Sequence, residues 1–165
     1  MIFPGELSVK AAALVDHLRA RKLMLATAES CTGGLIAGLI TSIPGSSDVF
    51  DSGFVTYSNA AKTRMTGVPA ALIARHGAVS AEVARAMAEG VLSHSAADVA
   101  VAVTGVAGPG GGTALKPVGL VHCAAARTGH ATVSQVLNLG NIGRDAVRIE
   151  TVRMAMDMAY EIAGP

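Results

Sequence analysis

Apolar positions along this chain recur with a helical period in some stretches and form short unbroken runs in others. From Leu7 to Arg21 apolar residues return every three to four positions, with charged residues mostly between them, which is typical of an amphipathic covering helix. The apolar run from Leu23 to Ala28 predicts a strand. The same reasoning predicts further strands over residues 50–57, 98–104, 118–126 and 132–139, and further helices over residues 35–43, 60–65, 69–76, a stretch after residue 80, and 144–162.

The order of these elements predicts the fold class. Strands and helices alternate over the first two-thirds of the chain, and two strands joined around Gly129 then form a hairpin ahead of the closing helix. This order predicts an α/β fold, a three-layer α/β/α sandwich with a mixed, mostly parallel sheet. Ser58 or Asn59 and Ser80 are the expected N-caps of two helices.

Composition narrows the class of protein. A chain of 165 residues is most simply one domain, residues 1–165. Hydrophobic residues make up 51% of the chain but aromatic ones only 3%, which indicates a core of Ala, Val, Leu, Ile and Met. The mean hydropathy is +0.48. However, no apolar run reaches the roughly 18 residues of a membrane-spanning helix, so we expect no membrane partner.

Charge and cysteine content bear on partners and location. The net charge is +1 and only 15% of residues are charged, so we expect no nucleic-acid partner, which would normally require a basic surface. The first six residues lack the pattern of a signal peptide, and the two cysteines, Cys31 and Cys123, fit a reducing compartment. We therefore expect a cytoplasmic protein. Its apolar composition and few charges favour a homo-oligomer.

The stretch Ala28–Gly34 joins the first predicted strand to the following helix and carries small reactive side chains. Its position predicts a site at the carboxyl edge of the sheet, beside the unpaired N–H groups of a helix start. Ser30 is the first candidate nucleophile, with those N–H groups as an oxyanion hole. A simple capping role for Ser30 is the alternative. Cys31 is a rival nucleophile, because a helix N-terminus lowers a thiol pKa, and its alternative is a small buried residue.

Lys62 and Tyr57 form a second candidate group. Lys62 is expected near the third position of its helix, where the helix dipole favours the neutral amine that a general base needs. Tyr57, at the end of the preceding strand, could relay a proton or orient that amine. The alternatives are an exposed lysine and a half-buried tyrosine.

Arg144 and Arg148 start the closing helix and predict a phosphate site there, although pairs with Asp145 and Glu150 on the surface are the alternative. The glycine-rich stretch 105–113 offers clustered backbone N–H groups to an anion but has neither the Walker nor the dinucleotide-binding pattern. The five histidines show no metal-binding spacing, and no Gly-x-Ser-x-Gly motif occurs.

Five blocks keep their order along nearly the whole chain: Ala28–Gly34, Val55–Asn59 with Lys62, Gly77–Ser80, Thr104–Gly119, and Arg144–Arg148. Together they resemble the C-terminal domain of the competence/damage-inducible protein CinA, in its stand-alone single-domain form. This family has nicotinamide mononucleotide deamidase activity. The resemblance implies an amidohydrolase that converts this nucleotide to nicotinate mononucleotide and ammonia in pyridine nucleotide recycling, with no cofactor and no metal.

The resemblance also implies residue roles. Ser30 is similar to the family's nucleophile, with Lys62 and Tyr57 as its activating partners. The substrate-binding residues that it implies are Cys31, Thr32 and Gly33 through their backbone N–H groups, Thr104 and Gly105 beside the ring and ribose, Gly108, and Arg144 at the phosphate.

Two positions depart from the family pattern. Gly110 stands where an acidic residue is common, and Ile142-Gly143-Arg144 replaces a frequent Gly-Asp-Arg. Both lie beside the implied nucleotide site, so they bear on substrate preference. The alternative hypothesis is a non-catalytic nucleotide-binding or protein-interaction module of the same fold. The pyrophosphatase activity of the other domain of full-length CinA proteins is not expected here.

Overall fold

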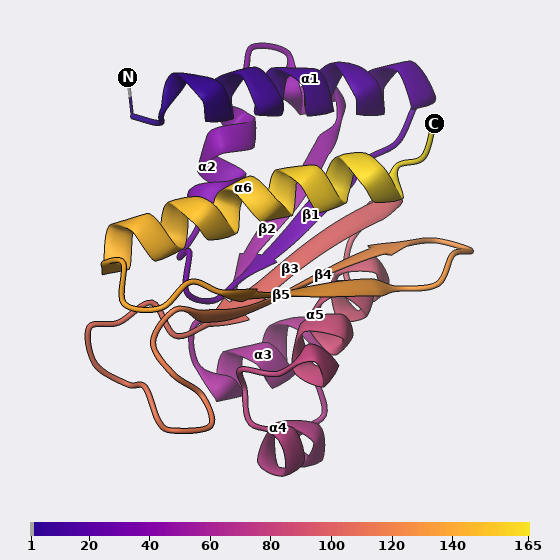
Figure 1. The fold of residues 1–165 in the computed structure, drawn as a ribbon. Coiled ribbons are helices and arrows are strands. Elements are labelled where there is room, and N and C mark those ends of the chain that lie inside the picture. Colours follow the sequence, from indigo (N-terminus) through magenta and orange to yellow (C-terminus); the bar gives the residue numbers. More distant parts are fainter. Residues whose placement is uncertain (1) are drawn as a thin grey trace.

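Five strands form one sheet in the order β2, β1, β3, β4, β5 in the computed structural model, which describes residues 2–165 (Figure 1). The strands are β1 (Leu25–Glu29), β2 (Phe50–Val55), β3 (Val99–Gly105), β4 (Leu120–Arg127) and β5 (Val133–Asn138). β1 pairs in parallel with β2 and β3, whereas β4 pairs antiparallel with both β3 and β5. Only β4 therefore runs against the others, which confirms the predicted mixed, mostly parallel sheet.

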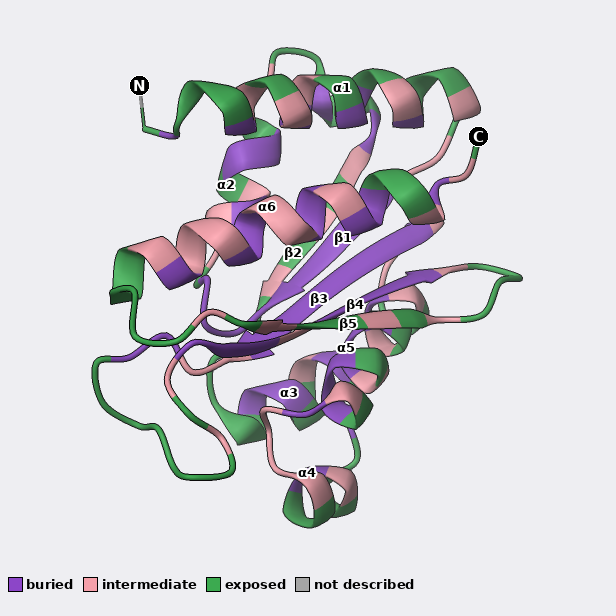
Figure 2. Cartoon of the chain, viewed as in Figure 1, coloured by how far each residue is buried: buried purple, intermediate pink, exposed green. Residues whose placement is uncertain are grey.

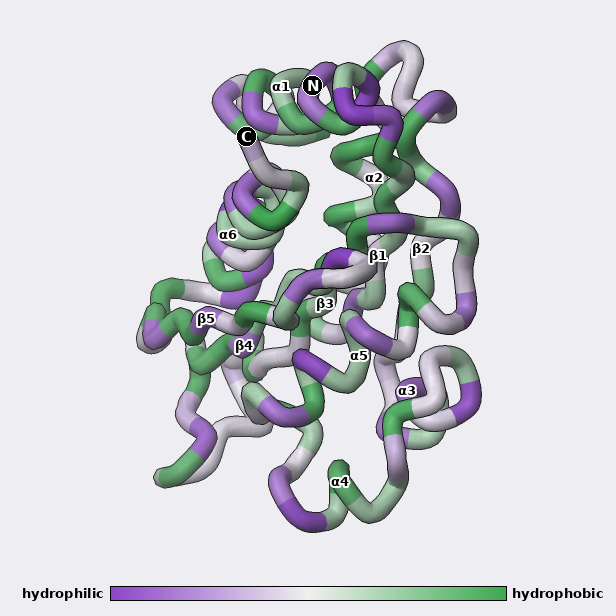
Figure 3. Tube along the Cα trace, turned by 90° about the vertical axis from the view of Figure 1, so that its right-hand side faces the viewer, coloured by the Kyte–Doolittle hydropathy of each residue, from purple (hydrophilic) through white to green (hydrophobic). Residues whose placement is uncertain are grey.

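Helices cover both faces of this sheet, as predicted. They are α1 (Gly5–Arg21), α2 (Leu35–Thr41), α3 (Asn59–Thr66), α4 (Ala70–His76), α5 (Ala81–Ser93) and α6 (Arg144–Ile162), with a short 3-10 helix, η1, over Ser46–Asp48. α2 and α6 lie on one face and α3 and α5 on the other, where α4 packs against these two helices (Figure 1). α1 lies over α2 and α6 rather than on the sheet, and the largely apolar α2 fills the space beneath it (Figure 3).

The two faces of the sheet present side chains of different size. β1 and β3 lie in the middle of the sheet and are buried almost throughout (Figure 2). The face toward α6 carries larger residues, among them Leu25, Val99, Val101 and Val103. The face toward α5 carries alanines: Ala26, Ala28, Ala100, Ala102, Ala124 and Ala126. Small side chains on that face let α5 pack close to the sheet.

Gly90 marks a close approach of α5 to α3. An ideal Cβ on Gly90 would lie 1.9 Å from the carbonyl oxygen of Thr66, the last residue of α3. We expect Gly90→Ala to lower the free energy of unfolding by about 1–3 kcal/mol, because overpacking outweighs the better helix propensity of alanine. Urea unfolding measures this, with Gly5→Ala, where nothing lies within 4 Å of the added Cβ, as control. Equal stability of the two variants would contradict the prediction.

The predicted boundaries agree with the structure to within a few residues. Ser58 and Ser80 are confirmed as N-caps, since their hydroxyls accept hydrogen bonds from helix N–H groups. β4 begins two residues later than predicted because Gly119 has a φ of +88° and lies against Gly140, whose carbonyl oxygen would be 2.2 Å from an added Cβ. Within residues 2–165, no helix has the length and apolar character needed to cross a membrane.

Candidate active site

A cavity of about 260 Å³ opens where the carboxyl ends of β1, β2 and β3 meet at one edge of the sheet. The residues that line it are Ser30, Cys31, Tyr57, Asn59, Lys62, Ala78, Val79, Thr104, Gly105, Val106, Ala107, Gly108, Gly110 and Arg144. Side chains from the ends of two strands, the first turns of α3 and the start of α6 therefore meet in one hollow.

Ser30 and Lys62 lie in contact within this cavity. Ser30 directly follows β1, where its N–H donates to the Val103 carbonyl of the neighbouring strand at 3.1 Å. The Lys62 Nζ lies 3.1 Å from the Ser30 Oγ and donates to the Thr56 carbonyl at 2.9 Å. Lys62 is only 1% exposed and Ser30 8%. The sequence alternative of an exposed lysine is therefore wrong.

Burial favours the neutral form of the Lys62 amine. Desolvation of its ammonium lowers the pKa of Lys62 below the usual 10.5. The sequence predicted that the dipole of the helix would favour the neutral amine. Burial of Lys62, the fourth residue of α3, is instead the cause of the lowered pKa. No carboxylate of residues 2–165 lies within ion-pair distance of it. A neutral amine that donates to Thr56 keeps its lone pair free to accept the Ser30 hydroxyl proton.

The turn after Ser30 is held by Glu29, a residue that the sequence analysis did not single out. Its buried carboxylate accepts hydrogen bonds from the Thr32 hydroxyl at 2.7 Å and from the N–H groups of Ile36 and Ala37 at 2.8 and 3.0 Å. The N–H groups at the start of α2, expected to form an oxyanion hole, are thus occupied. The N–H groups of Cys31 and Thr32 donate to no protein acceptor in the described part of the chain.

The surroundings of Cys31 disfavour it as the rival nucleophile to Ser30. Its side chain lines the cavity but is only 6% exposed. Burial raises the pKa of the Cys31 thiol to about 11, opposite to the lowering expected from a helix N-terminus. The thiol therefore stays protonated near neutral pH, and its alternative interpretation, a small buried residue, is confirmed.

Tyr57 and Arg144 meet at the mouth of the cavity. Tyr57 is 60% exposed, and its hydroxyl accepts a hydrogen bond from Arg144 at 3.2 Å. Arg144 also donates to the Gly108 carbonyl at 2.7 Å. No hydrogen bond joins Tyr57 to Lys62 within residues 2–165; the Thr56 carbonyl orients the amine instead. The role of Tyr57 as an activating partner stays a prediction.

The other predicted binding residues divide into two groups. Thr104, Gly105 and Gly108 line the cavity, and the Thr104 hydroxyl donates to the Ala78 carbonyl at 2.9 Å. Thr32, which is fully buried, is absent from the lining, as is Gly33. These two positions contribute to the turn rather than to the cavity wall.

Arg148 also lies outside the cavity lining. Its guanidinium donates to the carbonyls of Cys31 and Thr32 at 3.2 and 3.1 Å. Arg148 and Asp145 approach to 3.9 Å, as the surface-pair alternative proposed. Of the two arginines predicted for a phosphate site, only Arg144 lines the cavity, and its role stays a prediction.

The segment Ala78–Val79 is part of the cavity wall that sequence reasoning left without a role. Lys116 holds this segment by donating to the carbonyls of His76, at 3.1 Å, and Val79. In the sequence, the only indication that Ala78 and Val79 belong to the site was that they lie in the block Gly77–Ser80. Asn59 also lines the cavity, although the sequence suggested it only as a helix cap.

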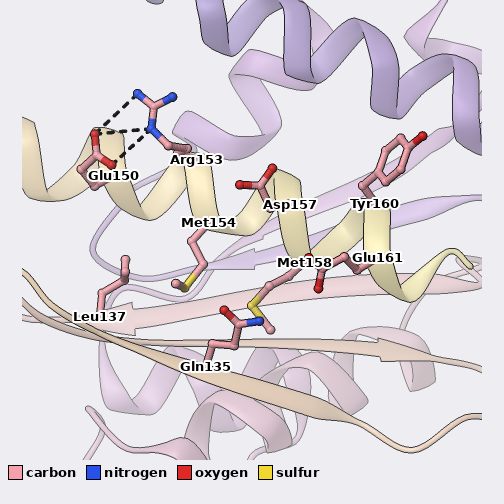
Figure 4. A pocket seen from close by; sticks show the side chains of 9 residues that line it. All are labelled: Gln135, Leu137, Glu150, Arg153, Met154, Asp157, Met158, Tyr160 and Glu161. Atoms are coloured by element: carbon pink, nitrogen blue, oxygen red, sulfur yellow. Dashed lines mark hydrogen bonds and ion pairs between the residues drawn. The ribbon is translucent and has the colours of Figure 1, made fainter.

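A second hollow of about 350 Å³ lies elsewhere, between α6 and the edge strand β5 (Figure 4). Met154 projects from α6 toward Leu137 of β5, and Met158 projects toward Gln135 of the same strand (Figure 4). Arg153 pairs with Glu150 on α6. None of the predicted site residues lines this hollow. Residues 2–165 bring together no group of three or more His, Cys, Asp or Glu side chains suited to a metal ion.

Comparison with known proteins gives a consistent result. The family model described as CinA C-terminal domain matches residues 8–163. A CinA-like protein of Akkermansia muciniphila is 58% identical over 125 residues, which are 76% of this chain and 30% of that protein. A CinA-like protein of Citrifermentans bemidjiense is 56% identical over 140 residues, 85% of this chain and 33% of that protein. The chain spans about a third of the length of these curated relatives.

Solved structures match over the whole chain. The competence/damage inducible protein CihA from Agrobacterium tumefaciens has a TM-score of 0.97 and 48% sequence identity, with 99% of each chain covered. A competence-damaged protein (CinA) superfamily protein from Escherichia coli has a TM-score of 0.90 and 31% identity, with 98% of this chain and 94% of that chain covered. The match confirms the predicted α/β fold.

Proposed function

The chain belongs to the CinA C-terminal domain family, and from that premise we propose that it is an amidohydrolase that converts nicotinamide mononucleotide to nicotinate mononucleotide and ammonia. The observation that carries the proposal is the buried pair of Ser30 and Lys62, with 3.1 Å between the hydroxyl oxygen and the amine nitrogen. A serine beside a buried lysine whose pKa is lowered by desolvation is suited to attack on a carboxamide.

In the first half of the proposed reaction, the Ser30 Oγ attacks the carboxamide carbon while Lys62 Nζ accepts the hydroxyl proton. The resulting oxyanion is held by the free backbone N–H group of Cys31, which lines the cavity. Lys62 then returns the proton to the leaving nitrogen, the C–N bond breaks, and ammonia departs. The nicotinoyl group remains bonded to Ser30 as an ester.

In the second half, water attacks the ester carbon and gives a proton to Lys62. The bond between the acyl carbon and the Ser30 oxygen breaks, and Lys62 returns the proton to that oxygen. Nicotinate mononucleotide leaves, and the enzyme is restored without a metal or redox step. Thr56 keeps the amine in place through both halves, because its carbonyl accepts one Lys62 N–H at 2.9 Å.

The nucleotide part of the substrate is assigned to the mouth of the cavity. Arg144 donates hydrogen bonds to the Gly108 carbonyl and the Tyr57 hydroxyl, and its remaining N–H groups are available to bind a phosphate. Thr104 and Gly105 line the same cavity, and the ring and ribose are assigned beside them. An ideal Cβ on Gly110 meets nothing within 4 Å, so the glycine leaves room at a position where relatives often carry an acid.

The test is ammonia release from nicotinamide mononucleotide by purified protein without added metal, compared with the Ser30→Ala variant. Release by the unaltered protein and loss in the variant support the proposal. Tight nucleotide binding without release would instead favour the non-catalytic module of the same fold. Cytoplasmic location and a homo-oligomeric state stay predictions, which fractionation and light scattering would check.

The pH dependence of the reaction follows from Lys62. Only the neutral amine accepts the Ser30 proton, so kcat/KM is expected to fall as the pH drops through the Lys62 pKa and to level off above it. Since burial lowers that pKa, the midpoint should lie below 10.5. Initial rates of ammonia release across the pH range measure the profile, with circular dichroism at each pH as the folding control. A midpoint at or above 10.5 would contradict the assignment.

A further inference from the structure

Arg148 forms hydrogen bonds with the turn that follows Ser30 and carries the proposed oxyanion donor. From the second turn of α6, Arg148 Nε and Nη2 donate to the carbonyls of Cys31 and Thr32 at 3.2 and 3.1 Å. The planar guanidinium thus binds two consecutive carbonyls with a fixed fork. The carboxylate nearest to Arg148 is that of Asp145, at 3.9 Å, and the Asp145 side chain is 97% exposed. This ion pair therefore contributes little to holding the arginine.

We propose that Arg148 is a positioning residue that fixes the turn after Ser30 so that the Cys31 N–H, in the cavity wall, faces the reacting carbonyl oxygen. In a trans peptide, C=O and N–H point in opposite directions. The Thr32 carbonyl that Arg148 binds shares its peptide unit with the Gly33 N–H, which donates to the Ser30 carbonyl at 3.0 Å. The Ser30 carbonyl in turn shares its peptide unit with the Cys31 N–H, so these bonds together fix the direction of that N–H. This inference rests on the proposed amidohydrolase function.

The two glycines of this turn give its backbone conformational freedom, which the hydrogen bonds from Arg148 restrict. Gly33 and Gly34 have φ values of +59° and +103°, and glycine loses more conformational freedom on ordering than other residues. Glu29 holds the Thr32 hydroxyl and the start of α2 but no carbonyl of the turn. Among the described residues, Arg148 is the side chain that binds the carbonyls of both Cys31 and Thr32.

Charge strengthens the case for a role in the transition state. The guanidinium carries a permanent positive charge and binds the carbonyl of Cys31, the residue whose N–H is assigned to the oxyanion. A fixed dipole and charge aimed at a site where negative charge develops lower the barrier without reorganisation. Burial raises the pKa of the Cys31 thiol, and the positive charge of Arg148 acts in the opposite direction on the same residue.

The test compares kcat and KM in four variants. Arg148→Met is expected to lower kcat about 10²-fold with KM changed less than about threefold, since an oxyanion donor acts mainly in the transition state. Arg148→Lys keeps the charge but not the fork and should recover part of that loss. Arg144→Met, one turn away, should instead mainly raise KM. Arg153→Met, whose partners Glu6 and Glu150 lie outside the site, is the control with unchanged kcat.

Two further readouts separate this inference from the proposed function. Hydrogen exchange at the amides of residues 31–33 should accelerate in Arg148→Met and not in Arg153→Met, and labelling of Ser30 by a fluorophosphonate probe should slow. If the unaltered protein releases no ammonia but both effects occur, the proposed function fails and the positioning role stands. If ammonia is released and Arg148→Met matches the control in kcat, exchange and labelling, the positioning role is overturned.

Discussion

Replacing Ser30 with alanine is expected to lower kcat for ammonia release by about 10⁶-fold, the order found when the nucleophile of a serine protease is removed. The substitution deletes the oxygen that attacks the carboxamide and forms the ester, and no other nucleophile near it is available. Cys31 is the adjacent candidate, but burial raises its thiol pKa to about 11. Binding of nicotinamide mononucleotide should persist, because Arg144, Thr104 and Gly105 are unchanged.

Ser46→Ala is a matched control for this variant. Ser46 lies in η1, is 8% exposed like Ser30, and does not line the cavity. Steady-state rates and isothermal titration calorimetry measure turnover and binding, and mass spectrometry after rapid acid quench detects a nicotinoyl ester on Ser30 in the unaltered protein. Ser30→Ala retaining more than about a tenth of the rate would rule out a serine nucleophile.

The layers of the fold could be predicted from sequence because each element carries a strong local pattern. The unbroken apolar run of β3 indicated a strand buried on both faces, and the hairpin around Gly129 indicated antiparallel strands at the end of the sheet. Local patterns do not report which elements touch. The position of α1 over other helices instead of the sheet depends on contacts with α2 and α6 that no single stretch encodes.

Site residues were predictable where position along an element also fixed position in space. Ser30 follows β1 and Thr104 lies at the carboxyl end of the parallel strand β3, so both had to reach the same sheet edge. The environment of a group was not predictable in this way. Glu29 looked unremarkable in sequence yet occupies the helix-start N–H groups, and the buried Cys31 thiol has its pKa shifted opposite to the expected direction. Burial and competing hydrogen bonds decide such cases.

Replacing Lys62 with methionine is the second large expected effect. Methionine has a similar length and no titratable nitrogen, so kcat should fall about 10³- to 10⁴-fold through loss of the general base. Lys10→Met, which removes an exposed pair with Asp157, is the control and should leave kcat unchanged. Ammonia release at a pH on the plateau of the unaltered protein measures both. A Lys62→Met variant with more than about a tenth of the unaltered rate would exclude Lys62 as the base.

The Lys62→Met variant also tests whether burial lowers the Lys62 pKa, through the pH dependence of the free energy of unfolding. Because burial lowers the Lys62 pKa in the folded state, the unfolded chain binds more protons between that pKa and 10.5. The free energy of unfolding should therefore rise with pH across this window. In Lys62→Met that rise should disappear while unfolding stays cooperative, even though the Thr56 carbonyl loses its donor. Urea unfolding at several pH values measures it, and an unchanged slope would mean that burial is not what keeps this amine ready to accept a proton.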